Sequence, residues 1–165
     1  MKRQMDRMLR AMTWADRQVL AAVPHDLALQ GEVLPLLAHL LAAEHIWLLR
    51  IYRRPARFPV RPSLTLAECE RLARENAAGY AGLLRTFSES DLQFAVPYRT
   101  TSGEECATPI IDILTHVVTH GASHRGQIAK ALRRAGVTPV DTDFITFARI
   151  MEPALVGSAR GEALA

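Results

Sequence analysis

The chain has 165 residues, a formal net charge of +3 and 49% hydrophobic residues, which are typical of one soluble domain that closes its own core. The basic residues are scattered and match no recognised nucleic-acid-binding motif, so we expect no nucleic-acid partner. The two cysteines, Cys69 and Cys106, match no CxxC pattern and so argue for neither a disulfide framework nor a cysteine zinc site, which favours a reducing, cytoplasmic location.

The first predicted helix covers residues 3–22, where apolar residues recur at helical spacing and pack as core. Residues 1–10 lack the apolar centre of a secretory signal, so no export is expected. A second helix is predicted from about Pro35 to Tyr52. It is apolar on most faces but interrupted by His39, Glu44 and His45, which indicates a buried bundle helix and not a membrane span.

Three prolines, at positions 55, 59 and 62, predict an irregular loop after the second helix. Thr65 and Glu68 then fit a capping box at the start of a third helix that ends near Phe87, with Cys69 packed as a small apolar residue. Residues 93–107 predict a short hairpin or extended loop around Ser102-Gly103.

A long helix is expected to follow, with Thr108 as its cap, Pro109 as its first residue and Gly136 as its stop. Asp141 predicts the cap of a short helix over residues 142–151 that Pro153 closes. The fold class is therefore all-α: a four-helix bundle over residues 1–152, with residues 153–165 as a flexible tail.

The long helix carries His116, His120 and His124 at intervals of four residues. Each interval turns about 400°, so the three imidazoles lie on one stripe. Ile113 and Ala131 share this stripe, which therefore points into the bundle, where unpartnered imidazoles would be costly.

His120 and His124 form an HxxxH pair that can hold a metal ion, and His39 on the second apolar helix is the expected third ligand. A core histidine hydrogen-bonded to an acceptor is the alternative for His39. Three imidazoles with an open fourth position suit zinc or nickel, with iron or manganese as alternatives.

The remaining polar residues near this stripe have other predicted places. A fourth histidine would close the site, so His116 is expected to pack or to support the ligands, and His45 and His25 are expected to be non-ligands. Glu44 either orients a ligand imidazole or pairs with an arginine. Gln127 hydrogen-bonds either a metal-bound water or substrate, or another side chain of the bundle.

Residues 39–48 (HLLAAEHIWL), the turn from Tyr98 to Gly103, and residues 112–127, which contain HxxxHRGQ, resemble the DinB/YfiT-like family over roughly residues 3–150. The resemblance implies a four-helix bundle, commonly a homodimer, that holds a divalent metal with one histidine of the second helix and two of the last. These positions correspond to His39, His120 and His124. The family is named for induction by DNA damage. Relatives act as transferases that use thiols such as bacillithiol or mycothiol, or as metal-dependent hydrolases.

The sequence therefore leaves two possible functions open. In the first, a metal at the three histidines activates a thiol or water for attack on a small electrophilic molecule, as in a thiol S-transferase. In the second, the protein is a non-catalytic metal-binding or stress-response bundle, in which the metal is structural or absent. Access to the histidines distinguishes the two, because catalysis needs a cavity that admits a substrate.

Overall fold

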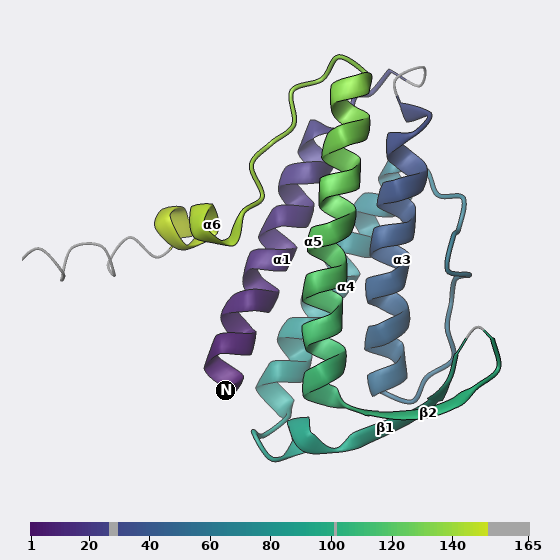
Figure 1. Ribbon diagram of the computed structural model, residues 1–165, viewed down its shortest axis with the longest axis vertical. Coiled ribbons are helices and arrows are strands. Elements are labelled where there is room, and N and C mark those ends of the chain that lie inside the picture. Colours follow the sequence, from purple (N-terminus) through teal and green to yellow (C-terminus); the bar gives the residue numbers. More distant parts are fainter. Residues whose placement is uncertain (27–29, 101, 152–165) are drawn as a thin grey trace, which may run out of the picture.

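The computed structural model describes residues 1–26, 30–100 and 102–151. The described part is mostly helical, with four long helices side by side, a two-stranded sheet at one end and a short helix beside α1 (Figure 1). The elements are α1 (Lys2–Ala22), α3 (Val33–Ile51), α4 (Leu66–Thr86), a 3₁₀ turn η1 (Asp91–Gln93), β1 (Ala95–Arg99), β2 (Glu105–Pro109), α5 (Ile110–Arg134) and α6 (Phe144–Met151). The predicted tail, residues 153–165, and Pro153 lie outside the described residues. The domain boundary at residue 152 stays a prediction.

The long helices pack because each presents apolar residues at helical spacing. In α1 the buried positions include Met5, Leu9, Met12 and Val19, as the sequence pattern predicts. Helix α3 contacts both α4 and α5, and α1 contacts the same two helices from the other side. The histidines of α3 and α5 can therefore meet across a helix interface.

Helix α3 is apolar because it lies inside the protein. By length and composition it could cross a membrane, yet 72% of its most apolar window is buried against the rest of the chain. Its apolar residues, such as Leu37, Leu40 and Leu41, are fully buried. This confirms the prediction of a core helix and accounts for its hydropathy without a membrane.

Several local predictions are confirmed. The capping box forms at Thr65, whose hydroxyl accepts from the Glu68 amide while the Glu68 carboxylate accepts from the Thr65 amide. Residues 52–65 form no regular element. Gly136 adopts a positive φ of 76° just after α5, a conformation that favours glycine at a helix end. The predicted hairpin is the antiparallel pair β1 and β2.

Most predicted helix starts differ from the observed ones by one or two residues. Helix α1 begins at Lys2 and not at residue 3, and α3 begins at Val33 and not at about Pro35. Thr108 does not cap α5 but belongs to β2, where it pairs with Val96. The hydroxyl oxygens of Thr108 and Tyr98 are 3.1 Å apart. Strand pairing thus continues to Pro109, and α5 begins at Ile110. Helix α6 begins at Phe144 and not at residue 142, because the Asp141 carboxylate accepts from the Asp143 amide in a turn that precedes the helix.

Candidate metal centre

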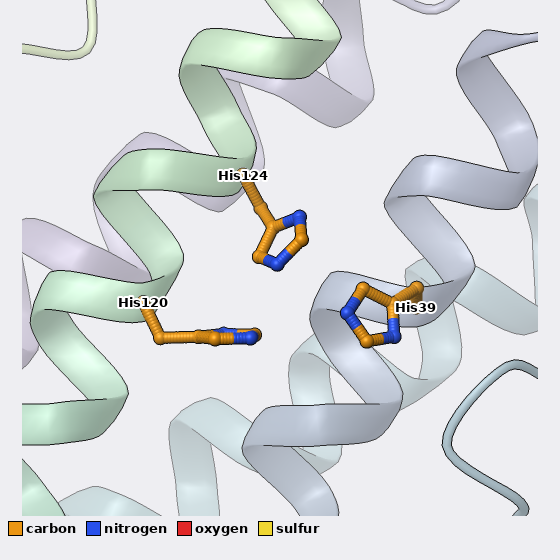
Figure 2. Close-up of side chains that lie close together, drawn as sticks. All are labelled: His39, His120 and His124. Atoms are coloured by element: carbon orange, nitrogen blue, oxygen red, sulfur yellow. The ribbon is translucent and has the colours of Figure 1, made fainter.

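Three histidines from two helices converge at one point (Figure 2). His120 and His124 project from successive turns of α5, and His39 faces them from α3. One ring nitrogen from each of the three lies within 4.8 Å of the other two. The ring centres are 4.3 Å apart for His120 and His124, and 4.6 Å apart for His39 and His124. The structure therefore brings together the three residues that the sequence selected.

A backbone carbonyl fixes the orientation of His39. This side chain is 6% exposed, and its Nδ1 lies 2.7 Å from the carbonyl oxygen of Val60 in the loop after α3. A carbonyl can only accept, so Nδ1 carries the proton and Nε2 of the neutral ring keeps its lone pair. Ligand histidines usually have their second nitrogen held in this way.

Both candidate ligands on α5, His120 and His124, have lowered pKa values, which favours their neutral form. Burial, together with the neighbouring His124, His116 and His39, lowers the pKa of His120 to about 4. Burial also lowers the pKa of His124, and a contact with Gln127 acts in the opposite direction. Neutral imidazoles offer lone pairs, as metal ligands must.

The buried Nδ1 of His124 has no hydrogen-bond partner among the described residues. A buried polar atom without a partner is costly, so this nitrogen marks a place where a ligand would be stabilising. The three imidazoles, with the free Nε2 of His39 among their donors, form a set that suits zinc, nickel or another divalent ion of similar preference. The donor set fits a metal.

A cavity of about 290 Å³ opens beside the histidines. His39 and His120 line one part of it, and Trp47, Arg50 and Tyr98 line another. The remaining lining residues are Ala43, Ile46, Val60 and Thr100. Two of the three candidate ligands are thus accessible to a small molecule.

Comparison with protein families identifies the fold family. The model of the family described as "DinB family" matches residues 1–155. The chain belongs to the DinB family. No curated protein matches the chain.

The other histidines of this DinB family member lie outside the cluster of three, although His116 is next to His120, with ring centres 5.3 Å apart. His116 packs against Trp47, with ring centres 5.2 Å apart, which agrees with the packing position expected for it. His45 is buried, and its Nδ1 lies 2.9 Å from the Asn76 Oδ1. His25 is exposed in the connection after α1. These three residues belong to no metal-type cluster within the described ranges.

Sequence reasoning missed a buried ion pair next to the site. Arg125, directly after His124, donates through Nη1 to Oδ1 of Asp16 on α1 over 2.8 Å, and the two side chains are 5% and 4% exposed. Asp16 interrupts the apolar stripe of α1, which was the available signal. The pair ties α5 to α1 at the turn that carries a candidate ligand.

Glu44 lies beside this ion pair. Burial and the charge of Asp16 raise the pKa of Glu44 well above its usual range. Asn76 donates to its Oε2 over 3.4 Å. Arg125 is close enough to act on Glu44 electrostatically, and within the described residues Glu44 makes no hydrogen bond to a candidate ligand. Among the described residues Glu44 therefore neither orients a ligand imidazole nor forms an ion pair with an arginine, and its carboxyl group accepts from Asn76 instead.

Proposed function

We propose that His39, His120 and His124 hold one divalent metal ion, zinc or nickel, with iron or manganese as alternatives. The observation that carries the proposal is the convergence of three ring nitrogens within 4.8 Å of one another from two separate helices. The carbonyl of Val60 supports it, because it leaves the other nitrogen of His39 free. Three imidazoles leave a coordination position open, as catalytic sites require.

We further propose that the protein is a metal-dependent enzyme that acts on a small electrophilic molecule with a thiol or water as the nucleophile. A divalent metal at such a site acts as a Lewis acid that lowers the pKa of a thiol or water. In the thiol reaction the sulfur bonds to the electrophilic carbon, the thiol proton passes to solvent, and the leaving group departs with its electron pair.

The residues of the chain have separate roles in this proposal. The ring of His39 is held in place by Val60, and Arg125 anchors the helical turn of His124 to α1. The walls of the cavity, Trp47 and Tyr98, exclude water from the side of a bound substrate. The cavity beside His39 and His120 favours catalysis over a sealed structural metal.

The alternative is a non-catalytic bundle protein in which the metal is structural or absent. Its support is the completeness of the core without a metal, since α3 and α5 pack directly through apolar residues such as Leu41 and Ile128. The four-helix-bundle description, the homodimer and the cytoplasmic location are likewise proposals that rest on the family resemblance or on the sequence.

Metal analysis of purified protein tests the first step. We expect close to one divalent ion per chain in the unaltered protein and less than about a tenth of that in His120→Ala. The matched control is His116→Ala, which removes the neighbouring imidazole on the same helix but lies outside the cluster. Equal metal content in all three proteins would contradict the assignment.

A screen of low-molecular-weight thiols against small electrophiles tests the second step. Product should form with the metal-loaded protein and fall to background after the metal is removed with a chelator. Activity that survives metal removal would reject the mechanism. Metal binding without turnover of any thiol or water reaction would favour the non-catalytic alternative.

A further inference from the structure

The cavity beside the histidines has a positively charged part, formed by Arg50 in the last turn of α3. The guanidinium carbon of Arg50 lies 4.4 Å from the ring centre of Trp47 and 4.8 Å from that of Tyr98. The two rings are 5.2 Å apart and nearly perpendicular, at 82°. The flat cation is therefore held in a corner between two aromatic side chains.

This arrangement leaves donors of Arg50 available. Aromatic rings interact with the flat faces of a guanidinium, whereas its N–H groups point outward from its edges. Across the described ranges, one hydrogen bond of the group is found, from Nη2 to the carbonyl of Arg99 over 3.3 Å, and no carboxylate forms an ion pair with it. Arg57, by contrast, is paired with Glu75.

The position of Arg50 makes this free edge significant. Burial lowers the pKa of Arg50, yet an arginine stays charged at neutral pH, so a cation lines the cavity without an anion beside it. Charged groups that lose water need a partner of opposite charge. The fork of a guanidinium matches a carboxylate in a two-pronged contact, and one cation balances one negative charge.

We propose that the cavity binds a small organic carboxylate, with its negative group on the edge of Arg50 and its body along the lining from Trp47 toward His120. The reacting end then lies toward His39 and His120, a part of the inference that rests on the proposed function. His39 and Arg50 are eleven residues apart on α3, about 16 Å along the helix axis, so the two parts are separate. The carboxylate belongs either to the electrophile or to the thiol cosubstrate.

Tryptophan fluorescence can report binding directly. The chain has two tryptophans, and Trp14 packs against Phe147 instead of lining the cavity. In Trp14→Phe, Trp47 is the only tryptophan. We would titrate this full-length, chelator-treated protein with benzoate and with benzamide, its neutral analogue of similar shape, at constant ionic strength. We expect saturable binding of benzoate and at least tenfold weaker binding of benzamide.

Substitution of two arginines then locates the site. Arg50→Met should weaken benzoate binding at least tenfold, while Arg50→Lys, which keeps the charge but not the fork, should give an intermediate loss. The matched control is Arg54→Met, since Arg54 also lies over an aromatic ring, 6.0 Å from the centre of Tyr52, but does not line the cavity. It should bind benzoate as the parent protein does.

Three results would overturn the inference: no saturable binding, equal affinity for benzoate and benzamide, or equal losses in Arg50→Met and Arg54→Met. Metal content measured on the same preparation before chelation keeps the two proposals separate. If the purified protein holds no metal before chelation but binds benzoate in a way that depends on Arg50, the carboxylate site is supported and the metal proposal is contradicted. If the purified protein holds metal but shows no preference for benzoate over benzamide, the metal proposal is supported and the carboxylate site is contradicted.

The same variants distinguish the two sources of the carboxylate. The zinc-loaded protein and its Arg50→Met variant would be titrated with 3-mercaptopropionate, a thiol acid. If the substitution weakens thiol-acid binding as much as benzoate binding, the carboxylate of the thiol occupies Arg50. If only benzoate binding is weakened, the carboxylate belongs to the electrophile. Either result supports the site.

Discussion

Asp16→Asn is expected to destabilise the protein strongly, because it leaves Arg125 as a buried charge without its partner. Breaking a buried ion pair by removing one side costs about 3–5 kcal/mol. The control is Glu75→Gln, which breaks the ion pair to Arg57 at the same 2.8 Å separation but at 55% and 37% exposure. An exposed pair contributes about 0–1 kcal/mol.

The structure places the expected cost near the lower end of this range. The charge of Asp16 helps to raise the pKa of Glu44, so the loss of that charge lets Glu44 ionise more easily and partly compensate Arg125. We therefore expect about 3 kcal/mol for Asp16→Asn, and a larger loss for Asp16→Asn combined with Glu44→Gln than the two single changes add up to. For a protein of this size, 3 kcal/mol lowers Tm by roughly 6–12 °C.

Guanidinium chloride unfolding followed by circular dichroism at pH 7 measures these differences. The denaturant midpoint should fall in Asp16→Asn while the slope stays constant, and Glu75→Gln should remain close to the unaltered protein. The reasoning is refuted if the free energies of unfolding of Asp16→Asn and Glu75→Gln lie within about 1 kcal/mol of each other. If the stability losses of Asp16→Asn and Glu44→Gln simply add up in the double variant, Glu44 does not compensate Arg125.

Two further predictions concern Glu44 and α4. The pKa of Glu44 is raised in the folded state, so its contribution to stability is full below about pH 4.5 and is lost as pH rises; Glu44→Gln should therefore be at least as stable as the parent at pH 8, and parallel stability curves from pH 5 to 8 would contradict this. Gly79→Ala should destabilise the fold, since its Cβ would overlap Cδ2 of the buried Leu48 at a cost of about 1–3 kcal/mol. Gly82→Ala, whose Cβ would lie 3.8 Å from its nearest neighbour, should stabilise by about 0.5–1 kcal/mol in thermal unfolding, and equal effects at both positions would rule out the overlap.

The sequence predicted what depends on local spacing. The helices follow from apolar residues at helical intervals, the start of α4 from Thr65 and Glu68, and the shared stripe of His120 and His124 from their four-residue interval. His39 could be selected as well, because a histidine within a helix that is apolar on most faces must have a partner.

Contacts between distant parts of the chain could not be predicted in the same way. Asp16 and Arg125 are 109 residues apart, and nothing local in either segment identifies the other. The cavity joins Trp47 and Arg50 of α3 to Tyr98 of β1, a combination that depends on how the hairpin packs against the helix. Even the start of α5 depended on such packing, because Thr108 pairs within the sheet.

The hydrogen bond from His39 to Val60 uses the main chain of the loop and not a side chain. This hydrogen bond does not depend on the side chain of residue 60, which is 39% exposed, but it does restrict the position of that residue along the loop. The number of residues between α3 and the carbonyl determines which way the imidazole turns. In evolutionary terms, the position of residue 60 should tolerate a change of side chain more readily than an insertion or deletion in the loop, which would displace the carbonyl that orients His39.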